Sequence, residues 1–268
     1  MTKLITVAVA GAAGRMGLSL VRALSVHPTL ELVACGIRPG AESLSRSHFE
    51  QAGLAFAAEL MMSDEDGLLD QAEAVIDFTS PSYTLALAGR VAKQGKILVS
   101  GTTGLQPGEK EALIHAGSTA RVVWSANMSI GVNLLQSLVE QAAAALDAHT
   151  DIEVLEMHHR MKQDAPSGTA LALGEAAARG RGVNLHDVWV KSRDGITGAR
   201  EQGSIGFATL RGGDVVGDHT VMFAGQGERI ELTHKASSRD IYARGALRAV
   251  EWASGKGPGF YTMQDVVR

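Results

Sequence analysis

The stretch from Val7 to Gly17, with glycine at positions 11, 14 and 17, limits most strongly what this chain can fold into. An apolar run ends at Gly11, and a helical pattern starts near Arg15. A strand followed by a glycine turn and a helix is typical of a βα unit whose backbone amides bind the phosphates of a dinucleotide. The spacing alone is a weak signal, and the alternative is a turn that needs its glycines only for packing.

Short apolar runs and helical patterns alternate through the first half of the chain. The predicted strands cover residues 5–10, 30–36, 74–78, 97–100 and 121–125, and the predicted helices cover 15–25, about 83–94 and a segment after Pro107. Continuous apolar strands that alternate with helices predict a parallel, doubly wound sheet, so the expected fold class is α/β of the Rossmann type. Residues 38–70 are expected to add a helix and a short strand.

The second half has a different pattern. A long helix over 130–148 precedes a strand at 151–158 and a helix at 168–179. Alternating runs at 204–211, 219–224 and 228–235, joined by glycine-rich turns, predict an antiparallel meander, and a helix over 240–254 follows. These patterns predict a dinucleotide-binding domain from residues 1–129 with 240–268. Residues 130–239 are expected to form an α+β domain for substrate binding and oligomerisation.

Composition excludes several classes of protein. The net charge of -4 gives no electrostatic reason to expect nucleic acid as a partner. No apolar run reaches the roughly 20 residues that span a bilayer, and residues 1–4 lead into a strand-like run without a signal-peptide pattern. The single cysteine, Cys35, excludes an intrachain disulfide and is expected to be a small buried residue. A cytoplasmic protein without membrane or nucleic-acid partners is therefore expected.

The residue that selects the cofactor is expected about 20 residues after the glycine turn, where NAD-selective folds place a carboxylate on the ribose 2′-hydroxyl. Counting from Gly17 reaches Ile37, and Arg38 follows it. A guanidinium in place of a carboxylate favours the 2′-phosphate of NADPH. The alternative is that Arg38 is a solvated loop residue.

The ends of the fourth and fifth predicted strands are expected to bind the nicotinamide, since ligands bind at the carboxyl ends of such strands. Small residues there let the backbone approach the ring. The residues concerned are Gly101, Thr102 and Thr103, and Ser125, Ala126, Asn127 and Met128. The amide of Asn127 either bonds the ligand or holds the loop.

Two adjacent histidines follow the strand at 151–158. Successive strand residues alternate faces, so His158 and His159 point in opposite directions and would chelate one metal poorly; no metal site is expected. Imidazole titrates near neutral pH, so His158 is a candidate proton donor, with a structural histidine as the alternative. The neighbouring Lys162 favours the catalytic interpretation.

Ser167 is predicted to cap the helix that follows Pro166. The amides of Gly168 and Thr169 would then form a carboxylate site at the helix start, with Lys162 adding a positive charge for a second carboxylate. The segment therefore suits a small dicarboxylate, unless Ser167 is a cap and nothing more. No catalytic role is expected for the remaining polar cluster, which would lie on a solvated face or an oligomer surface: Arg211, Asp218, His219, Thr233, His234, Lys235 and Arg239.

The chain resembles the dihydrodipicolinate reductases (4-hydroxy-tetrahydrodipicolinate reductases) over nearly its whole length. The most specific segments are Gly11–Gly17, Gly101–Gly104, Ile205–Thr209, Thr233–Arg239 and, above all, the run His-His-x-x-Lys-x-Asp-Ala-Pro-Ser-Gly-Thr-Ala from His158 to Ala170. The resemblance implies NAD(P)H-dependent reduction of 4-hydroxy-tetrahydrodipicolinate to tetrahydrodipicolinate, in the diaminopimelate route to lysine. It also implies a homotetramer.

The resemblance also assigns roles to residues. His158 matches the proton donor and Lys162 a second proton donor, and His159, Lys162, Gly168 and Thr169 match contacts to substrate carboxylates. The implied cofactor contacts at the glycine turn are Gly11, Ala12, Ala13, Gly14, Arg15 and Met16, beside the 101–103 and 125–128 segments. Many members carry an acidic residue where Ile37 stands, which favours NADPH over dual use of NADH and NADPH here. Met128 replaces a common aromatic residue.

Two other classes are compatible with the first domain. One is a different two-domain dehydrogenase, although no cysteine is placed for the thiohemiacetal chemistry of an aldehyde dehydrogenase. The other is a regulator that senses a dinucleotide without turnover. Such a regulator would not need His158 and Lys162 beside a carboxylate site.

Overall fold

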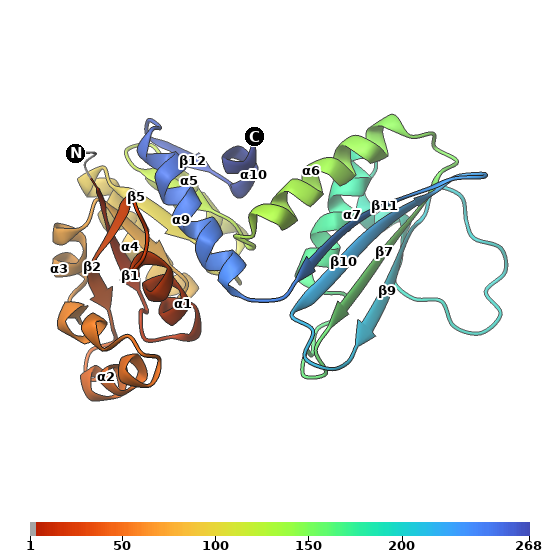
Figure 1. Ribbon diagram of the computed structural model, residues 1–268. Helices are drawn as coiled ribbons and strands as arrows, with labels where there is room; N and C mark the ends of the chain where they lie inside the picture. Colours follow the sequence, from red (N-terminus) through yellow and green to blue (C-terminus); the bar gives the residue numbers. More distant parts are fainter. Residues whose placement is uncertain (1–3) are drawn as a thin grey trace. The chain divides into compact units, whose positions relative to one another are not determined.

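The computed structural model describes residues 4–268, with the side chain of Glu65 left out, and the chain divides into two compact units (Figure 1). The first unit contains the chain up to Ile130 together with Arg239–Arg268, and the second contains Gly131–Ser238. Residues 1–3, part of the stretch that argued against a signal peptide, lie outside the described residues. In the described part of the chain, no helix has the length and apolar character needed to cross a membrane.

The first unit is built on a seven-stranded sheet whose neighbouring strands are all parallel. In sheet order the strands are β12 (Gly259–Tyr261), β6 (Arg121–Trp124), β5 (Ile97–Ser100), β4 (Ala74–Asp77), β1 (Ile5–Ala10), β2 (Leu30–Gly36) and β3 (Met61–Met62). The chain winds outward from β1 to β3 and then resumes at β4 on the other side, so the winding reverses between β1 and β4. The doubly wound α/β sheet predicted from the sequence is confirmed. The short β12 was not predicted, because three residues carry too little periodicity.

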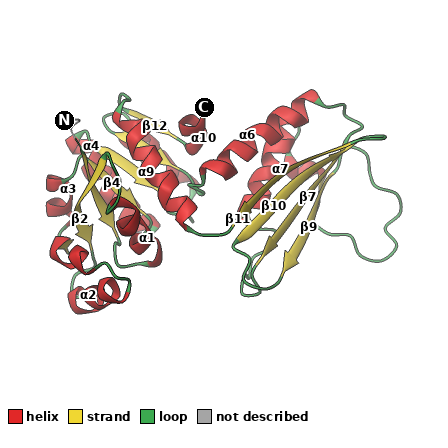
Figure 2. Cartoon of the chain, viewed as in Figure 1, coloured by secondary structure: helices red, strands yellow, loops and turns green. Residues whose placement is uncertain are grey.

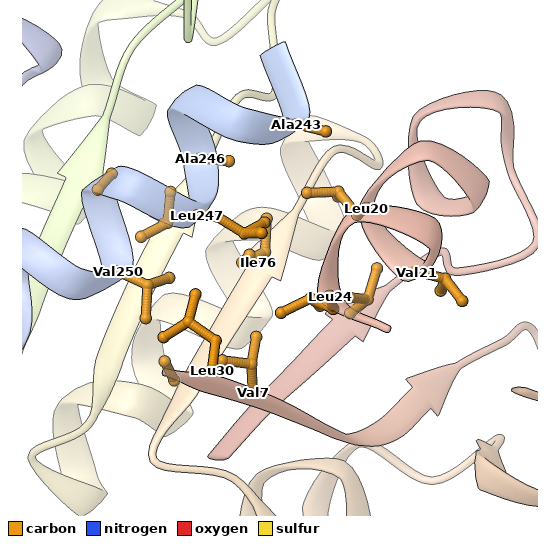
Figure 3. Packing of buried hydrophobic residues seen from close by; sticks show 14 of the residues in the cluster. Val7, Leu20, Val21, Leu24, Leu30, Ile76, Ala243, Ala246, Leu247 and Val250 are labelled. Carbon is orange, nitrogen blue, oxygen red and sulfur yellow. The ribbon is translucent and has the colours of Figure 1, made fainter. Parts of the chain in front are cut away.

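Helices cover both faces of this sheet because its strands are apolar on both sides. One face packs against α1 (Arg15–Leu24), α2 (Glu42–Gln51), the short 3₁₀ helix η1 (Ala55–Leu60), α9 (Asp240–Ser254) and α10 (Met263–Val267). The other packs against α3 (Glu65–Gln71), α4 (Pro81–Gln94) and α5 (Pro107–Ala116). Figure 3 shows the first core, in which Val7 and Ile76 of the sheet meet Leu20 of α1 and Leu247 of α9.

The second unit contains a five-stranded mixed sheet. In sheet order the strands are β11 (Arg229–Ala236), β10 (Gly217–Ala224), β7 (Asp151–His158), β9 (Ile205–Arg211) and β8 (Trp189–Val190). The hairpin of β10 and β11 is antiparallel as predicted, but the prediction of a three-stranded meander is wrong, because β9 pairs in parallel with β7. The glycine turn after β9 does not form a hairpin with β10. Gly212 N donates to His158 O and His159 N to Val215 O, so the turn crosses the end of β7 and places β10 on its other edge.

One face of this second sheet is covered by α6 (Ile130–Ala145) and α7 (Gly168–Arg181) (Figure 2). The short helix α8 (Leu185–Val188) packs beside α7. Along β7 the residues alternate between buried and half-buried. Ile152 and Val154 join the apolar core on the helix-covered side, and Glu156 and His158 follow on that same face. The alternation expected for His158 is therefore confirmed, and it brings a carboxylate and an imidazole under the helices.

Candidate active site

The glycine turn after β1 leaves the start of α1 open. Gly14, which precedes the helix, is exposed and has no side chain to cap it. Gly11 has φ +64°, in the left-handed region that favours glycine, and a Cβ added at Gly17 would fall within 3.0 Å of the carbonyl oxygens of Gly11 and Ala12. The first amides of α1 therefore lie at an uncovered helix N-terminus, which fits the pyrophosphate of a dinucleotide.

Asp77, at the end of the neighbouring β4, is fully buried and organises the same edge of the sheet. Its carboxylate accepts hydrogen bonds from Ser100 Oγ and Thr102 Oγ1, each at 3.0 Å, and from Thr79 Oγ1 at 2.6 Å. Asp77 thus ties the ends of β4 and β5 together. The sequence interpretation missed this residue, although a carboxylate that ends an apolar run and precedes Thr79 was a usable signal.

The two segments expected at the nicotinamide lie after β5 and β6, on the same carboxyl edge as the glycine turn. Gly101 packs so closely on the ring of Phe78 that an added Cβ would overlap it, and Thr102 O accepts from Trp124 Nε1 at 3.0 Å. Asn127 Oδ1 accepts from Ser129 N at 2.9 Å, so this amide holds the loop. Met128 is 1% exposed and belongs to the core, and its carbonyl packs closely against Gly245 of α9.

The residues expected to select the cofactor follow β2. Ile37 N donates to Met62 O of β3 at 2.8 Å, which fixes the backbone, and the Arg38 side chain is exposed. Arg38 therefore lies at the same carboxyl edge with a guanidinium open to solvent. Together with the open helix start, these residues fit a pyridine dinucleotide.

Glu156 is the central side chain of the second unit's site and is 1% exposed. It accepts a hydrogen bond from His158 Nδ1 at 2.6 Å and from Ser167 N at 3.0 Å, and both outer nitrogens of Arg211 donate to it at 2.8 and 3.0 Å. Burial raises the pKa of Glu156, but the hydrogen bonds from Arg211, His158 and Ser167 together lower it below its ordinary value. Glu156 is therefore ionised, and it accepts the hydrogen bond that His158 Nδ1–H donates. The other ring nitrogen of His158, Nε2, is thus left for proton transfer.

His219 of β10 packs against this pair. Its ring meets that of His158 edge to face, with centroids 5.0 Å apart, and its Nε2 is 3.2 Å from Ser167 Oγ. Burial, reinforced by the nearby His158, lowers the pKa of His219 to about 4, so this imidazole is neutral at pH 7. We expected Arg211 and His219 to lie on a solvated face or an oligomer surface, without a catalytic role. The structure corrects this placement, because His219 is buried and both residues contact the site. Alternation with the apolar Val221 and Phe223 was the signal for burial of His219.

The remaining predicted site residues lie on the segment between β7 and α7. Lys162 Nζ forms an ion pair with Asp164 at 2.8 Å, and the half-buried His159 is tied to Val215 O through its backbone amide. Ser167 caps α7, accepting from Ala170 N at 3.1 Å. Gly168 is exposed, and an added Cβ there would meet nothing within 4 Å. The structure therefore joins His158 to the helix start through Glu156 and leaves that helix start open.

Among the described residues, no group of three or more His, Cys, Asp and Glu side chains is arranged to hold a metal ion. The second unit also offers acids and bases of its own. It provides an imidazole held by a carboxylate, a lysine and a helix N-terminus suited to anions.

A doubly wound sheet with an open glycine turn, joined to a mixed-sheet unit that carries a buried carboxylate–imidazole pair, defines a two-domain reductase of the dinucleotide-binding class. Family profiles give the particular family: "Dihydrodipicolinate reductase, N-terminus" matches residues 5–128 and "Dihydrodipicolinate reductase, C-terminus" matches residues 131–267. The chain belongs to the dihydrodipicolinate reductase family.

Curated relatives match the chain over its length. The 4-hydroxy-tetrahydrodipicolinate reductase of Agrobacterium fabrum is 54% identical over 260 residues, covering 97% of this chain and 94% of the relative. That of Parvibaculum lavamentivorans is 52% identical over 268 residues, covering 100% and 99%. Among solved structures, the dipicolinate-bound dihydrodipicolinate reductase from Paenisporosarcina sp. TG-14 has a TM-score of 0.80 at 23% identity, covering 97% of each chain. This last likeness supports the fold.

Proposed function

We propose that this protein reduces 4-hydroxy-tetrahydrodipicolinate to tetrahydrodipicolinate with NAD(P)H, in the diaminopimelate route to lysine. Relatives above 50% identity over almost the whole chain are reductases of this name. The observation that carries the proposal is the bond from His158 to a buried carboxylate that also anchors the start of α7. In this proposal the same carboxylate holds the proton donor and the anion site within one unit.

The start of α7 suits one carboxylate of the substrate. Ser167 is engaged as the cap, and the helix dipole favours an anion at Gly168 and Thr169. In this proposal Lys162 and His159 pair with the second carboxylate, and Lys162 exchanges its ion pair with Asp164 for one with the substrate. A solved relative that carries dipicolinate, a dicarboxylate, supports this class of ligand.

His158 acts as the proton donor in this proposal. When bound, NAD(P)H supplies the hydride that reaches C4 of the substrate. The imidazolium of His158 donates its proton from Nε2, while Nδ1–H remains bonded to Glu156. The carboxylate stabilises the charged imidazole before the transfer and keeps the ring oriented after it. Lys162 is the second proton donor and assists the preceding loss of water.

We further propose that NADPH is preferred to NADH. Arg38 is exposed at the end of β2, where a guanidinium pairs with a 2′-phosphate, and Ile37 stands where an NAD-selective protein has a carboxylate. A pyridine nucleotide itself is the cofactor that the family and the open glycine turn support. The bacterial biosynthetic relatives support a cytoplasmic location.

The test is oxidation of NADPH and NADH with substrate generated in place from pyruvate and aspartate semialdehyde by the preceding synthase. We expect synthase-dependent oxidation that is faster with NADPH, and an Arg38→Ala variant whose KM rises for NADPH more than for NADH. We expect His158→Ala to lose about 100-fold or more in kcat, as removal of a general acid does. A folded protein that binds the cofactor without oxidising it would instead be a dinucleotide sensor. Near-full turnover by His158→Ala would remove His158 from the chemical step.

A further inference from the structure

One carboxylate connects two parts of the second unit's site that are distant in sequence. Glu156 Oε2 accepts His158 Nδ1–H at 2.6 Å, and Glu156 Oε1 accepts Ser167 N–H at 3.0 Å. Arg211 donates to both oxygens and also to Asp164 O at 2.6 Å, so the loop before α7 is held by the same network. The spacing between the imidazole and the helix start therefore depends on this carboxylate, together with His219, which contacts both the His158 ring and Ser167 Oγ.

Glu153, three residues earlier on the opposite face of β7, shows what a purely structural carboxylate does on this strand. Its oxygens accept hydrogen bonds from Arg193 at 2.8 and 2.9 Å and from Arg200 at 3.0 Å. Burial raises the pKa of Glu153, but the two arginines have the larger effect and hold this pKa below its ordinary value. Glu156 lies on the same strand and also accepts hydrogen bonds from an arginine. It differs in bonding an imidazole and a helix start.

We propose that Glu156 is a positioning residue that holds His158 with its proton on Nδ1 and fixes Ser167 at the start of α7, so that the proton donor and the carboxylate site keep one spacing. The inference rests on the proposed function, since it assumes that His158 donates the proton. A carboxylate that accepts from one ring nitrogen of a histidine sets the tautomer and the orientation of the ring. Its charge also stabilises the imidazolium from which the proton leaves.

The charged groups around His158 give this role a definite pH signature. Arg211 from β9 bonds the same carboxylate, and His219 from β10 packs on the ring. Lys162, from the loop before α7, lies within electrostatic range of His219. Arg211 and Lys162 are cationic and disfavour a charged His158, whereas Glu156 favours it. Without the charge of Glu156, the imidazolium of His158 should therefore lose its proton at a lower pH than in the wild type.

The experiment compares Glu156→Gln with Glu153→Gln, the matched variant on the other face of β7. We expect Glu156→Gln to lower kcat about 100-fold and to move the alkaline limb of the kcat profile to lower pH, while the KM for NADPH stays within about twofold. Glu156→Asp, which restores the charge at a longer distance, should recover part of kcat and return the limb toward its original pH. Glu153→Gln should keep both kcat and the profile.

A second measurement uses the unmodified protein and does not depend on the variants folding. In protein labelled with ¹⁵N-histidine, neutral His158 should carry its proton on Nδ1, with Nε2 bare. A neutral His158 protonated on Nε2 would overturn the proposal, and so would an active wild type whose Glu156→Gln variant matches Glu153→Gln in kcat and pH profile. An inactive wild type with the Nδ1–H tautomer would instead contradict the proposed function, while it would still support the hydrogen bond between His158 and Glu156.

Discussion

His219 is 4% exposed against the ring of His158, and these surroundings decide which form of its imidazole is stable. In the unfolded chain a histidine has a pKa near 6.5, whereas burial lowers the pKa of His219 to about 4 in the folded protein. Between pH 4 and pH 6.5, this histidine therefore binds a proton more readily in the unfolded chain than in the folded protein. The neutral imidazole contributes stability above pH 6.5, and that contribution is lost as the pH falls toward 4.

We expect the free energy of unfolding to fall by up to about 3 kcal/mol more in the wild type than in His219→Gln between pH 7 and pH 4. Burial also lowers the pKa of His234, which gives a loss of the same sign in both proteins, so the difference between them isolates His219. Urea unfolding at several pH values measures it. Parallel curves for the two proteins would show that His219 is not the titrating group.

At the scale of elements, the sequence predicted which segments form strands and helices better than it predicted which strands pair. The alternation of apolar and polar residues predicted β7 and β9, because the buried and exposed faces of a strand can be recognised from its own sequence. The partner of β9 depends on where the glycine turn at Gly212 crosses β7, and this is set by hydrogen bonds to His158 and His159 that no local pattern contains.

The same limit explains the site residues that were missed. His158, Lys162 and Ser167 lie close together in sequence and could be recognised as one segment. Arg211 and Glu156 meet only because β9 is parallel to β7, with Arg211 in register with His158. The predicted meander, in which β9 pairs with β10, gave no indication that Arg211 lies in the site.

The start of α1 offers a test at this same scale. A Cβ at Gly17 would meet backbone atoms within 3.0 Å, whereas the exposed Gly89 of α4 has nothing within 4 Å of an added Cβ. We expect Gly17→Ala to lower the free energy of unfolding by about 1–3 kcal/mol and to weaken NADPH binding. Gly89→Ala should raise stability by about 0.5–1 kcal/mol through helix propensity alone. Urea unfolding and cofactor titration measure both, and equal behaviour of the two variants would contradict close packing at the glycine turn.

At the scale of the molecule, the face of the second sheet away from α6 and α7 is the surface that we propose for assembly into a homotetramer. Leu155, Met157 and Leu210 lie on this face by alternation and register, and Leu210 is 48% exposed. Met222 of β10 lies on the same face, in register with Glu153. Apolar residues on an uncovered sheet face are typical of a surface that pairs with another copy.

We expect the wild type to have four times the 28.1 kDa mass of the chain in light scattering after gel filtration. Met222→Arg, which places a charge on this face, should shift the mass to smaller species. Val26→Arg is the matched control, since Val26 is an 83% exposed apolar residue of the first unit. A tetramer that survives Met222→Arg would place the contact elsewhere, and a monomeric wild type would contradict the proposed assembly.

The position of β7 in the middle of its sheet has a consequence during synthesis. Both edges of β7 pair with strands made later, β9 at Ile205–Arg211 on one side and β10 at Gly217–Ala224 on the other. A ribosome must therefore add more than 50 residues after His158 before either edge is satisfied. During that interval the nascent chain presents a strand with both edges unpaired, which is the kind of segment that can pair with other chains before its own partners are made.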